Sequence, residues 1–224
     1  MRHAESTKNV AGRFGPDSKK EPLTQNGKRQ AELLACGILE MASKIAPATI
    51  RYLYAGPSER ASATVMPVAN HSGLTPVEVP ELSSFQIPGL NGSSEKQLID
   101  AGNFMFSSLA LYRAGLLNSY DLPGVREPSV VYEAQVLRWL QGESKKWAEP
   151  SIAVVVAHRS PLTALAIGIA RMSHGYPNDF FGHVLVEYCG LIAILVGNNG
   201  LFRIIAASPT PEELTPHLVR LEGG

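Results

Sequence analysis

Residues 152–156 read Ile-Ala-Val-Val-Val (IAVVV), an unbroken apolar run. A strand that is apolar at every position is typical of a parallel sheet whose two faces are both covered by helices. Ligands of such sheets bind beyond the carboxyl ends of the strands. Because Ala157 and then His158 follow the run directly, the sequence predicts a polar side chain at the functional edge of a parallel sheet.

Short apolar runs alternate with helical patterns on both sides of this strand. Further strands are expected at 50–54 and 77–79, and as a hairpin of 190–196 and 201–207 around a Gly-Asn-Asn-Gly turn. Helices are expected from Thr24 to Pro47, from Ser58 to Pro67, and over 95–117, 129–147 and 161–172, with loops at 4–22 and 80–94. The alternation predicts an α/β fold, a three-layer sandwich with a mostly parallel central sheet flanked by helices.

Length and charge set the domain organisation and exclude some partners. The 224 residues suit a single domain, 1–224, in which residues 84–150 are expected to form a helical and loop insertion on the substrate side. Lysine plus arginine and aspartate plus glutamate both total 20, so nothing draws the whole chain to nucleic acid or to a membrane surface. No apolar run has the roughly 18 residues that a membrane-spanning helix needs.

Cysteine and histidine usage sets expectations for compartment and cofactors. Cys36 and Cys189 stand in separate apolar segments, so two thiols in a reducing cytoplasm are expected rather than a disulfide. Four further histidines are scattered without the i, i+4 spacing of metal ligands: His71, His174, His183 and His217. We therefore expect neither a metal nor a cofactor.

Charged side chains follow the ends of the expected strands. The carboxyl ends of parallel strands share one edge of the sheet, so side chains placed there are expected to meet. Counting a strand that residues before Met1 would form, these side chains are Arg2, His3, Arg60, Glu81 and His158.

Two arginines, two histidines and a carboxylate together indicate phosphoryl transfer. The planar guanidinium group of arginine binds phosphate oxygens in pairs. A neutral imidazole can attack phosphorus and form a phosphohistidine, provided that a hydrogen bond holds its other ring nitrogen. A second histidine can stabilise charge on the phosphoryl oxygens, and a carboxylic acid can protonate the leaving alkoxide.

Four segments, in order along the chain, carry a family resemblance. They are Arg2-His3-Ala4-Glu5-Ser6 with Asn9, Pro22-Leu23-Thr24 with Gly27 and Gln30-Ala31, Gly56-Pro57 with Arg60-Ala61 and Thr64, and Val154-Val155-Val156-Ala157-His158. They resemble the signature segments of the histidine phosphatase superfamily, the phosphoglycerate-mutase-like proteins. The resemblance covers most of the chain.

The resemblance implies a role for each of these residues. His3 would be the nucleophile that becomes phosphorylated, and Asn9 would line its pocket. The phosphoryl group would be bound by Arg2, Arg60 and His158. The activity implied is hydrolysis of a small phosphomonoester, with a phosphomutase of the same superfamily or a non-catalytic phosphate-binding or regulatory module as alternatives. The expected partner is a small phosphorylated substrate, and a homodimer stays open.

The general acid departs from the superfamily pattern. A gap-free alignment on Leu82 and Gly92 puts Ser84 where the acid belongs, and a serine is a poor acid near neutral pH. Aligning Glu81 instead requires a loop longer by about three residues, and loop insertions cost little. Glu81 is therefore the preferred general acid, with a merely solvated loop carboxylate as the alternative. Glu133 could enter the pocket, but a solvated helix face is the expected place for it.

The start of the sequence is a second departure. Superfamily members carry an apolar strand immediately before Arg-His, whereas here Met1 alone precedes Arg2 and His3. Either the native start lies upstream, or the nucleophile hangs from an untethered terminus. A catalytic histidine must be held to within a fraction of an ångström. We therefore expect weakened stability or activity in the absence of residues upstream of Met1.

Overall fold

The computed structural model describes residues 1–13, 21–45, 48–86, 90–102, 129–148, 150–174, 188–197 and 200–208. Its elements, in chain order, are α1 (Thr7–Val10), α2 (Gln25–Lys44), β1 (Thr49–Ala55), α3 (Glu59–Ser72), β2 (Val77–Glu78), the 3-10 helix η1 (Pro80–Leu82), α4 (Glu95–Asp100), α6 (Ser129–Ser144), β3 (Ser151–Val156), α7 (Arg159–His174), β4 (Leu191–Val196) and β5 (Phe202–Ser208).

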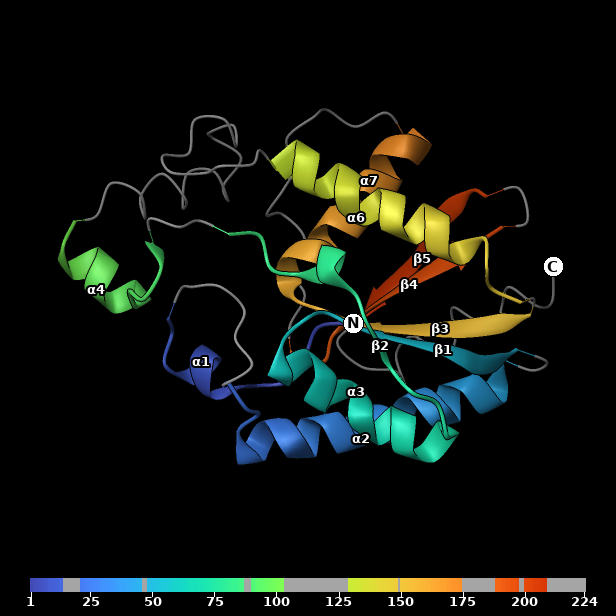
Figure 1. The fold of residues 1–224 in the computed structure, drawn as a ribbon, viewed down its shortest axis with the longest axis horizontal. Helices are drawn as coiled ribbons and strands as arrows, with labels where there is room; N and C mark the ends of the chain where they lie inside the picture. Colours follow the sequence, from blue (N-terminus) through green and yellow to red (C-terminus); the bar gives the residue numbers. More distant parts are fainter. Residues whose placement is uncertain are drawn as a thin grey trace.

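The elements form three layers. β2, β1 and β3 pair in that order as a parallel sheet, and β4 and β5 pair as an antiparallel hairpin. α2 and α3 lie on one side of the strands, and α6 and α7 lie on the other (Figure 1). The structure therefore confirms the α/β sandwich with a mostly parallel central sheet.

Each helical layer has its own apolar core, and the strands divide their side chains between the two. Successive side chains of a strand point to opposite faces. Leu53 of β1 accordingly packs toward α2 and α3, and its neighbour Tyr54 packs toward α6 and α7. The first core includes Leu34, Ile38, Val65, Val68 and Val154, and the second includes Val136, Leu140, Leu165, Ile169 and Phe202. Each fully buried aliphatic side chain contributes about 1.5–3 kcal/mol.

The start of α2 agrees with its sequence signal. Thr24 is the N-cap, and its Oγ1 accepts a hydrogen bond from the Gly27 backbone at 2.9 Å. Gly27 itself lies against the backbone of Glu5. A Cβ at position 27 would stand 1.9 Å from the Glu5 carbonyl oxygen, so only glycine lets α2 approach this closely.

α3 runs further than the sequence predicts. Pro67 was expected to kink or end the helix, but the helix continues through it and ends at Ser72, before Gly73 with φ +69°. Proline removes one backbone hydrogen bond. Burial of the neighbouring Val65, Val68 and Ala69 offsets that loss.

The expected loops contain short helices. α1 lies within 4–22, and η1 lies within 80–94. The helix expected over 95–117 is described only to residue 102, and α4 ends at Asp100. Residues 103–128 lie outside the described part of the chain, so the insertion expected at 84–150 stays a prediction.

The first three residues lie between the parallel sheet and the hairpin. The amino group of Met1 donates to the Val155 carbonyl at 2.7 Å, and the His3 backbone donates to Ala157 at 2.9 Å. On the other side, the Arg2 backbone donates to the Gly190 carbonyl at 3.0 Å. The alternative in which His3 hangs from an untethered terminus therefore does not hold, because backbone hydrogen bonds hold the residues around His3 on both sides.

Candidate active site

His3, Arg60 and His158 meet at the carboxyl ends of the parallel strands. His3 follows the short ladder between Arg2 and Ala157, Arg60 lies in the first turn of α3, and His158 joins β3 to α7. Each of the three is only 3% exposed. The amino-terminal ends of α3 and α7 point their partial positive charge toward the same region, which favours an anion.

Polar contacts to α2 and α3 hold the backbone that carries His3. The Ala4 backbone donates to Thr64 Oγ1 at 3.0 Å, and the Glu5 backbone donates to Gln30 Oε1 at 2.9 Å. Buried backbone donors cost free energy when they lack a partner. These two side chains therefore fix the path of the chain directly after His3.

Arg60 lies at the centre of the cluster. Its Nε donates to His3 Nε2 at 3.2 Å, and its Nη2 donates to His158 Nδ1 at 3.2 Å. The rings of His3 and His158 are edge to face, with centroids 5.0 Å apart. One permanently charged guanidinium group thus contacts both imidazoles.

His3 is arranged as a neutral imidazole in one tautomer. Its Nδ1 lies 2.7 Å from the Ala4 carbonyl and donates to it, so Nε2 carries the lone pair and faces Arg60. Burial lowers the pKa of His3 well below its usual value, and the nearby His158 and Arg60 lower it further. A neutral imidazole with a fixed tautomer is what nucleophilic attack requires.

His158 is held between Arg60 and Ser58. Because its Nδ1 accepts from Arg60, its Nε2–H donates to Ser58 Oγ at 3.2 Å. Ser58 is also the N-cap of α3, where its Oγ accepts from the Ala61 backbone at 3.3 Å. The cap therefore links the orientation of His158 to the start of α3.

Arg2 packs against an aromatic ring beside His3. Its guanidinium carbon lies 4.0 Å from the centroid of the Tyr188 ring, a cation–π contact. The same ring lies 6.2 Å from the His3 ring, centroid to centroid. Tyr188 therefore brings the Arg2 charge close to the cluster.

An acidic residue lies at the edge of the cluster. Glu21 Oε2 accepts from Arg60 Nη1 at 2.5 Å and lies 3.6 Å from Lys8 Nζ. The side chain of Glu21 is 22% exposed, whereas that of Arg60 is 4% exposed. An anion that enters from solvent would therefore meet Glu21 as a competitor for Arg60.

Asn9 is bound to the start of its own helix. Its Oδ1 accepts from Ser6 Oγ at 2.5 Å and from the Ser6 backbone at 3.3 Å. Ser6 is fully buried. Among the described residues, no hydrogen bond joins Asn9 to His3, Arg60 or His158.

The carboxylates of Glu81 and Glu133 differ in burial. Glu81 lies exposed in η1, and no hydrogen bond or ion pair joins it to the described residues of the cluster. Glu133 is buried and accepts from Arg171 Nη1 at 2.5 Å. The expectation that Glu133 faces solvent is therefore wrong, because α6 packs this carboxylate against α7.

Four residues of the site were not predicted from the sequence. Ser58 had a signal, since it stands two residues before Arg60 in the segment that resembles the superfamily. The sequence gives no comparable signal for Lys8, Glu21 and Tyr188, because only the tertiary structure brings them near the cluster.

The donor set of the cluster suits an anion and not a cation. Two guanidinium groups and two helix amino-terminal ends surround the imidazoles. No group of three or more histidine, cysteine, aspartate or glutamate side chains with metal-ligand geometry occurs among the described residues.

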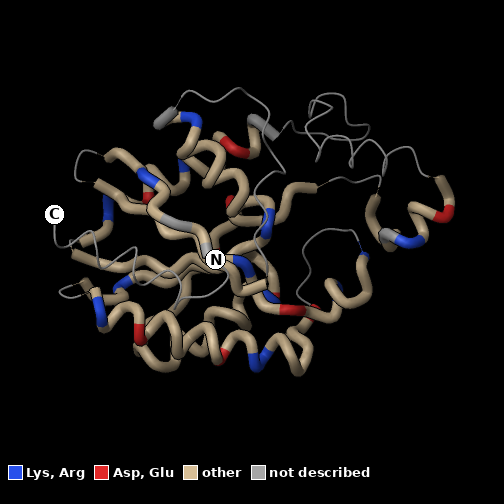
Figure 2. Tube along the Cα trace, turned by 180° about the vertical axis from the view of Figure 1, so that it is seen from behind, with Lys and Arg blue, Asp and Glu red and all other residues tan. Residues whose placement is uncertain are grey.

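The described helices include none long and apolar enough to cross a membrane. Basic and acidic positions are interspersed along the described trace in Figure 2.

Solved structures share the fold. An alpha-ribazole phosphatase from Shigella flexneri is 18% identical, with a TM-score of 0.71 over 94% of this chain and 95% of that chain. A phosphoserine phosphatase from Entamoeba histolytica, in complex with 3-phosphoglyceric acid, is 16% identical, with a TM-score of 0.71 over 97% and 96%. A mycobacterial glucosyl-3-phosphoglycerate phosphatase is 18% identical, with a TM-score of 0.71 over 93% and 96%. At these identities the likeness concerns the fold.

The family comparison covers nearly the whole chain. A search of curated protein sequences found no significant match. The family model of the histidine phosphatase superfamily (branch 1) matches residues 1–205, which include all four segments that suggested the resemblance. The chain belongs to the histidine phosphatase superfamily.

Proposed function

We propose that this protein is a phosphatase that hydrolyses a small phosphomonoester through a phosphohistidine on His3. The observation that carries the proposal is the state of His3, whose Nδ1 is bonded to the Ala4 carbonyl while Nε2 faces Arg60. This geometry puts the lone pair on Nε2, where it accepts from Arg60 until a phosphoryl group binds Arg60 in its place, and it keeps positive charge beside Nε2. The membership of the superfamily supports the same chemistry.

In the first step, His3 Nε2 attacks phosphorus. A bond forms between Nε2 and phosphorus, and the bond between phosphorus and the ester oxygen breaks. Arg2, Arg60 and His158 bind the phosphoryl oxygens and stabilise the charge that they carry in the transition state. Asn9 lines the pocket in this proposal.

The leaving alkoxide needs a proton, and Glu81 is the proposed donor. Glu81 follows β2, whose carboxyl end lies at the same edge of the sheet as that of β1. General acid catalysis of this kind is worth about 10²–10⁴ in rate for a poor leaving group. In the second step, water attacks the phosphohistidine, the bond between Nε2 and phosphorus breaks, and inorganic phosphate leaves.

The proposal also covers the substrate, the surface that recognises it and the cellular compartment. The substrate is a small phosphorylated molecule, and residues 84–150 supply the surface that recognises its other end. A reducing cytoplasm suits the cysteines, since Cys36 and Cys189 are both free thiols.

A second candidate is a non-catalytic phosphate-binding module. Two observations favour it: Glu81 is exposed and not bonded to the cluster, and Glu21 already accepts from Arg60. Such a module would bind inorganic phosphate without turnover.

An aryl phosphate separates the two candidates, because its leaving group hardly needs a proton. We expect p-nitrophenyl phosphate turnover that His3→Ala abolishes and Glu81→Gln reduces by less than about tenfold, whereas an alkyl phosphate should lose about 10²-fold or more in Glu81→Gln. Glu78→Gln, at an exposed acid of β2, is the control and should change neither rate. Phosphate binding without turnover of either ester would favour the module.

A further inference from the structure

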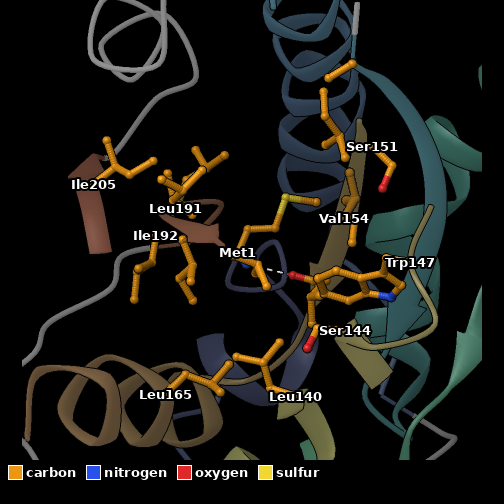
Figure 3. A pocket seen from close by; sticks show the side chains of 18 of the residues that line it. Met1, Leu140, Ser144, Trp147, Ser151, Val154, Leu165, Leu191, Ile192 and Ile205 are labelled. Atoms are coloured by element: carbon orange, nitrogen blue, oxygen red, sulfur yellow. Dashed lines mark hydrogen bonds between the residues drawn. The ribbon is translucent and has the colours of Figure 1, made fainter. Parts of the chain in front are cut away.

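A cavity of about 810 Å³ lies between β3 and β4 (Figure 3). The described residues that line it carry apolar or uncharged polar side chains, such as Leu140, Ser151 and Ile192. A phosphorylated ligand would lose its hydration in this cavity and gain no charged side chain as a partner. Charged partners for such a ligand lie instead around Arg60.

The guanidinium group of Arg60 presents two different sides. Its Nε and Nη2 face the imidazoles of His3 and His158, each at 3.2 Å. Its Nη1 donates instead to Oε2 of Glu21. Because a guanidinium group has five N–H donors in a fixed plane, it can hold one anion on one side and donate to a second anion on another. A phosphoryl group on the side of the histidines therefore leaves Nη1 to serve a second anionic group.

Lys8 brings a second cation to the same position as Nη1. Its Nζ lies 3.6 Å from the Glu21 oxygen that accepts from Arg60. Lys8 belongs to α1 and Arg60 to α3, so segments far apart in the chain supply the two cations. The side chains of Lys8 and Arg60 are only 10% and 4% exposed. Shielding from water strengthens the attraction of both cations for an anion between them.

The carboxylate of Glu21 marks the position that a second anionic group would take. The side chain of Glu21 is 22% exposed, more than that of either cation, so it has a path to solvent. The Thr7 backbone donates to the carbonyl of Pro22 at 3.0 Å, which fixes the chain next to Glu21. We therefore expect a rotamer change of Glu21, and not a movement of the chain, to vacate the position.

A carboxylate suits this position better than a second phosphate. It has the charge and the oxygen geometry of the Glu21 group, so exchanging one for the other leaves the local charge balance unchanged. A second phosphate would bring about two negative charges to a position that holds one. Because both anionic groups would contact the same guanidinium group, a short carbon chain must join them.

We propose that Arg60 Nη1 and Lys8 Nζ form a carboxylate subsite, and that the substrate is a small phosphorylated carboxylic acid. Glu21 occupies the subsite in the free protein, and the carboxylate of the substrate displaces it. The inference rests on the proposed function, since the phosphoryl group is placed beside His3 and His158. Lys8 determines specificity and takes no part in the bond changes.

The test uses two phosphonates, which resist hydrolysis and so report binding alone. Phosphonopropionate carries a carboxylate at the far end of its carbon chain, where propylphosphonate has a methyl group. Calorimetric titration gives both Kd values, and their ratio measures the preference for the carboxylate. We expect Glu21→Gln to raise this preference about fivefold, because the competing carboxylate is gone. Lys8→Met should lower it about fivefold, as for the loss of a partly exposed ion pair.

Two further variants separate the charge of Lys8 from its packing. Lys8→Arg keeps the positive charge and should restore most of the preference. Lys44→Met is the matched control, because Lys44 pairs with Glu40 on the exposed face of α2, and it should change neither Kd. A general loss of folded protein weakens the binding of both phosphonates alike, so it does not change their ratio.

Three outcomes would overturn the proposal. The first is equal Kd values for the two phosphonates in Glu21→Gln, the variant that removes the competing carboxylate. The second is a preference that Lys8→Met leaves unchanged. The third is tighter binding of a bisphosphonate of the same chain length, which would assign the subsite to a second phosphate. Turnover of p-nitrophenyl phosphate is measured separately: its absence would contradict the proposed phosphatase activity, whereas the ratio of Kd values tests the subsite.

Discussion

Arg60 donates to His3, His158 and Glu21 among the described residues, and the two histidines are those on which the proposed chemistry depends. The sequence placed Arg60, His3 and His158 at strand ends, and the structure brings them into contact. Their tautomers could not be read from the sequence, because these depend on the Ala4 carbonyl and on Ser58 Oγ. The contact of Arg60 with Glu21 likewise depends on the folded path of the chain.

The buried state of His3 predicts how its imidazole titrates. Burial, His158 and Arg60 all disfavour the protonated ring, so the pKa of His3 lies well below its usual value. As pH falls, His3 should therefore stay neutral through the usual range of histidine titration near 6.5. Imidazole nitrogen shifts measured by NMR should keep the values of a neutral ring with Nδ1 protonated. A titration midpoint near 6.5 would contradict this.

Glu21 should weaken the binding of anions at Arg60. Its carboxylate accepts from Arg60 and lies near Lys8, so a phosphate oxygen must displace it. We expect Glu21→Gln to tighten the Kd for inorganic phosphate about fivefold, the value of about 1 kcal/mol for a partly exposed ion pair. Calorimetric titration measures the Kd. Glu40→Gln, on the exposed face of α2 beside Lys44, is the control.

A larger Kd for phosphate in Glu21→Gln would contradict this role of Glu21. Glu21 would then hold Arg60 in its binding position instead of competing with the ligand.

At the scale of the elements, the hydrophobic periodicity of the sequence predicted the buried strand and helix, whereas a single helix-breaking residue was a poorer guide. The apolar run at 152–156 and the helical spacing after Thr24 correspond to β3 and α2. The helix end predicted from Pro67 was wrong, because burial of α3 in the tertiary structure outweighed the loss of one backbone hydrogen bond. The predicted solvent exposure of Glu133 was wrong for a related reason. Its partner Arg171 lies on another helix, so the local sequence around Glu133 does not indicate the ion pair.

The N-cap of α3 should matter for both stability and catalysis. Ser58→Ala removes the oxygen that accepts from Ala61 and from His158. We expect a loss of about 1 kcal/mol in the free energy of unfolding, as for other caps. Turnover should fall as well, because His158 loses the partner of its Nε2–H. Urea unfolding and steady-state kinetics give the two quantities.

Ser94→Ala separates capping from catalysis. Ser94 caps α4, where its Oγ accepts from Gln97. This variant should leave kcat unchanged, and any effect on substrate recognition by residues 84–150 should appear in KM. If Ser58→Ala also left turnover unchanged, the role of Ser58 would be confined to the cap.

At the scale of the whole molecule, helices cover the strands on both sides, and the described strands form two separate sheets. The three-layer architecture was predictable, because it follows from the alternation of apolar runs and helical patterns. The hydrogen bonds from Met1 to Val155 and from Arg2 to Gly190 could not be predicted from the sequence, because they depend on how β3 and β4 face each other.

The position of Met1 makes the stability of the whole fold depend on pH. Burial lowers the pKa of the Met1 amino group to about 5, whereas an amino terminus in an unfolded chain titrates at about 8. As pH falls from 8 to 5, the unfolded chain takes up the proton first, so the free energy of unfolding decreases over this window. Acetylation of the amino group removes this titration.

The acetylated chain should therefore lose less stability than the free chain between about pH 8 and about pH 5.5, measured as the urea midpoint. Equal losses in the two forms would indicate that the amino group titrates in the same way in the folded and the unfolded chain.

The central claim, phosphoryl transfer through His3, is tested most directly by trapping the intermediate. A radiolabelled aryl phosphate is mixed with the protein, and the reaction is stopped during turnover with denaturant at alkaline pH, since phosphohistidine is stable to base and labile to acid. The account predicts acid-labile label on the peptide that contains His3, and no label in His3→Gln. Turnover without label on His3, or label on another residue, would contradict it.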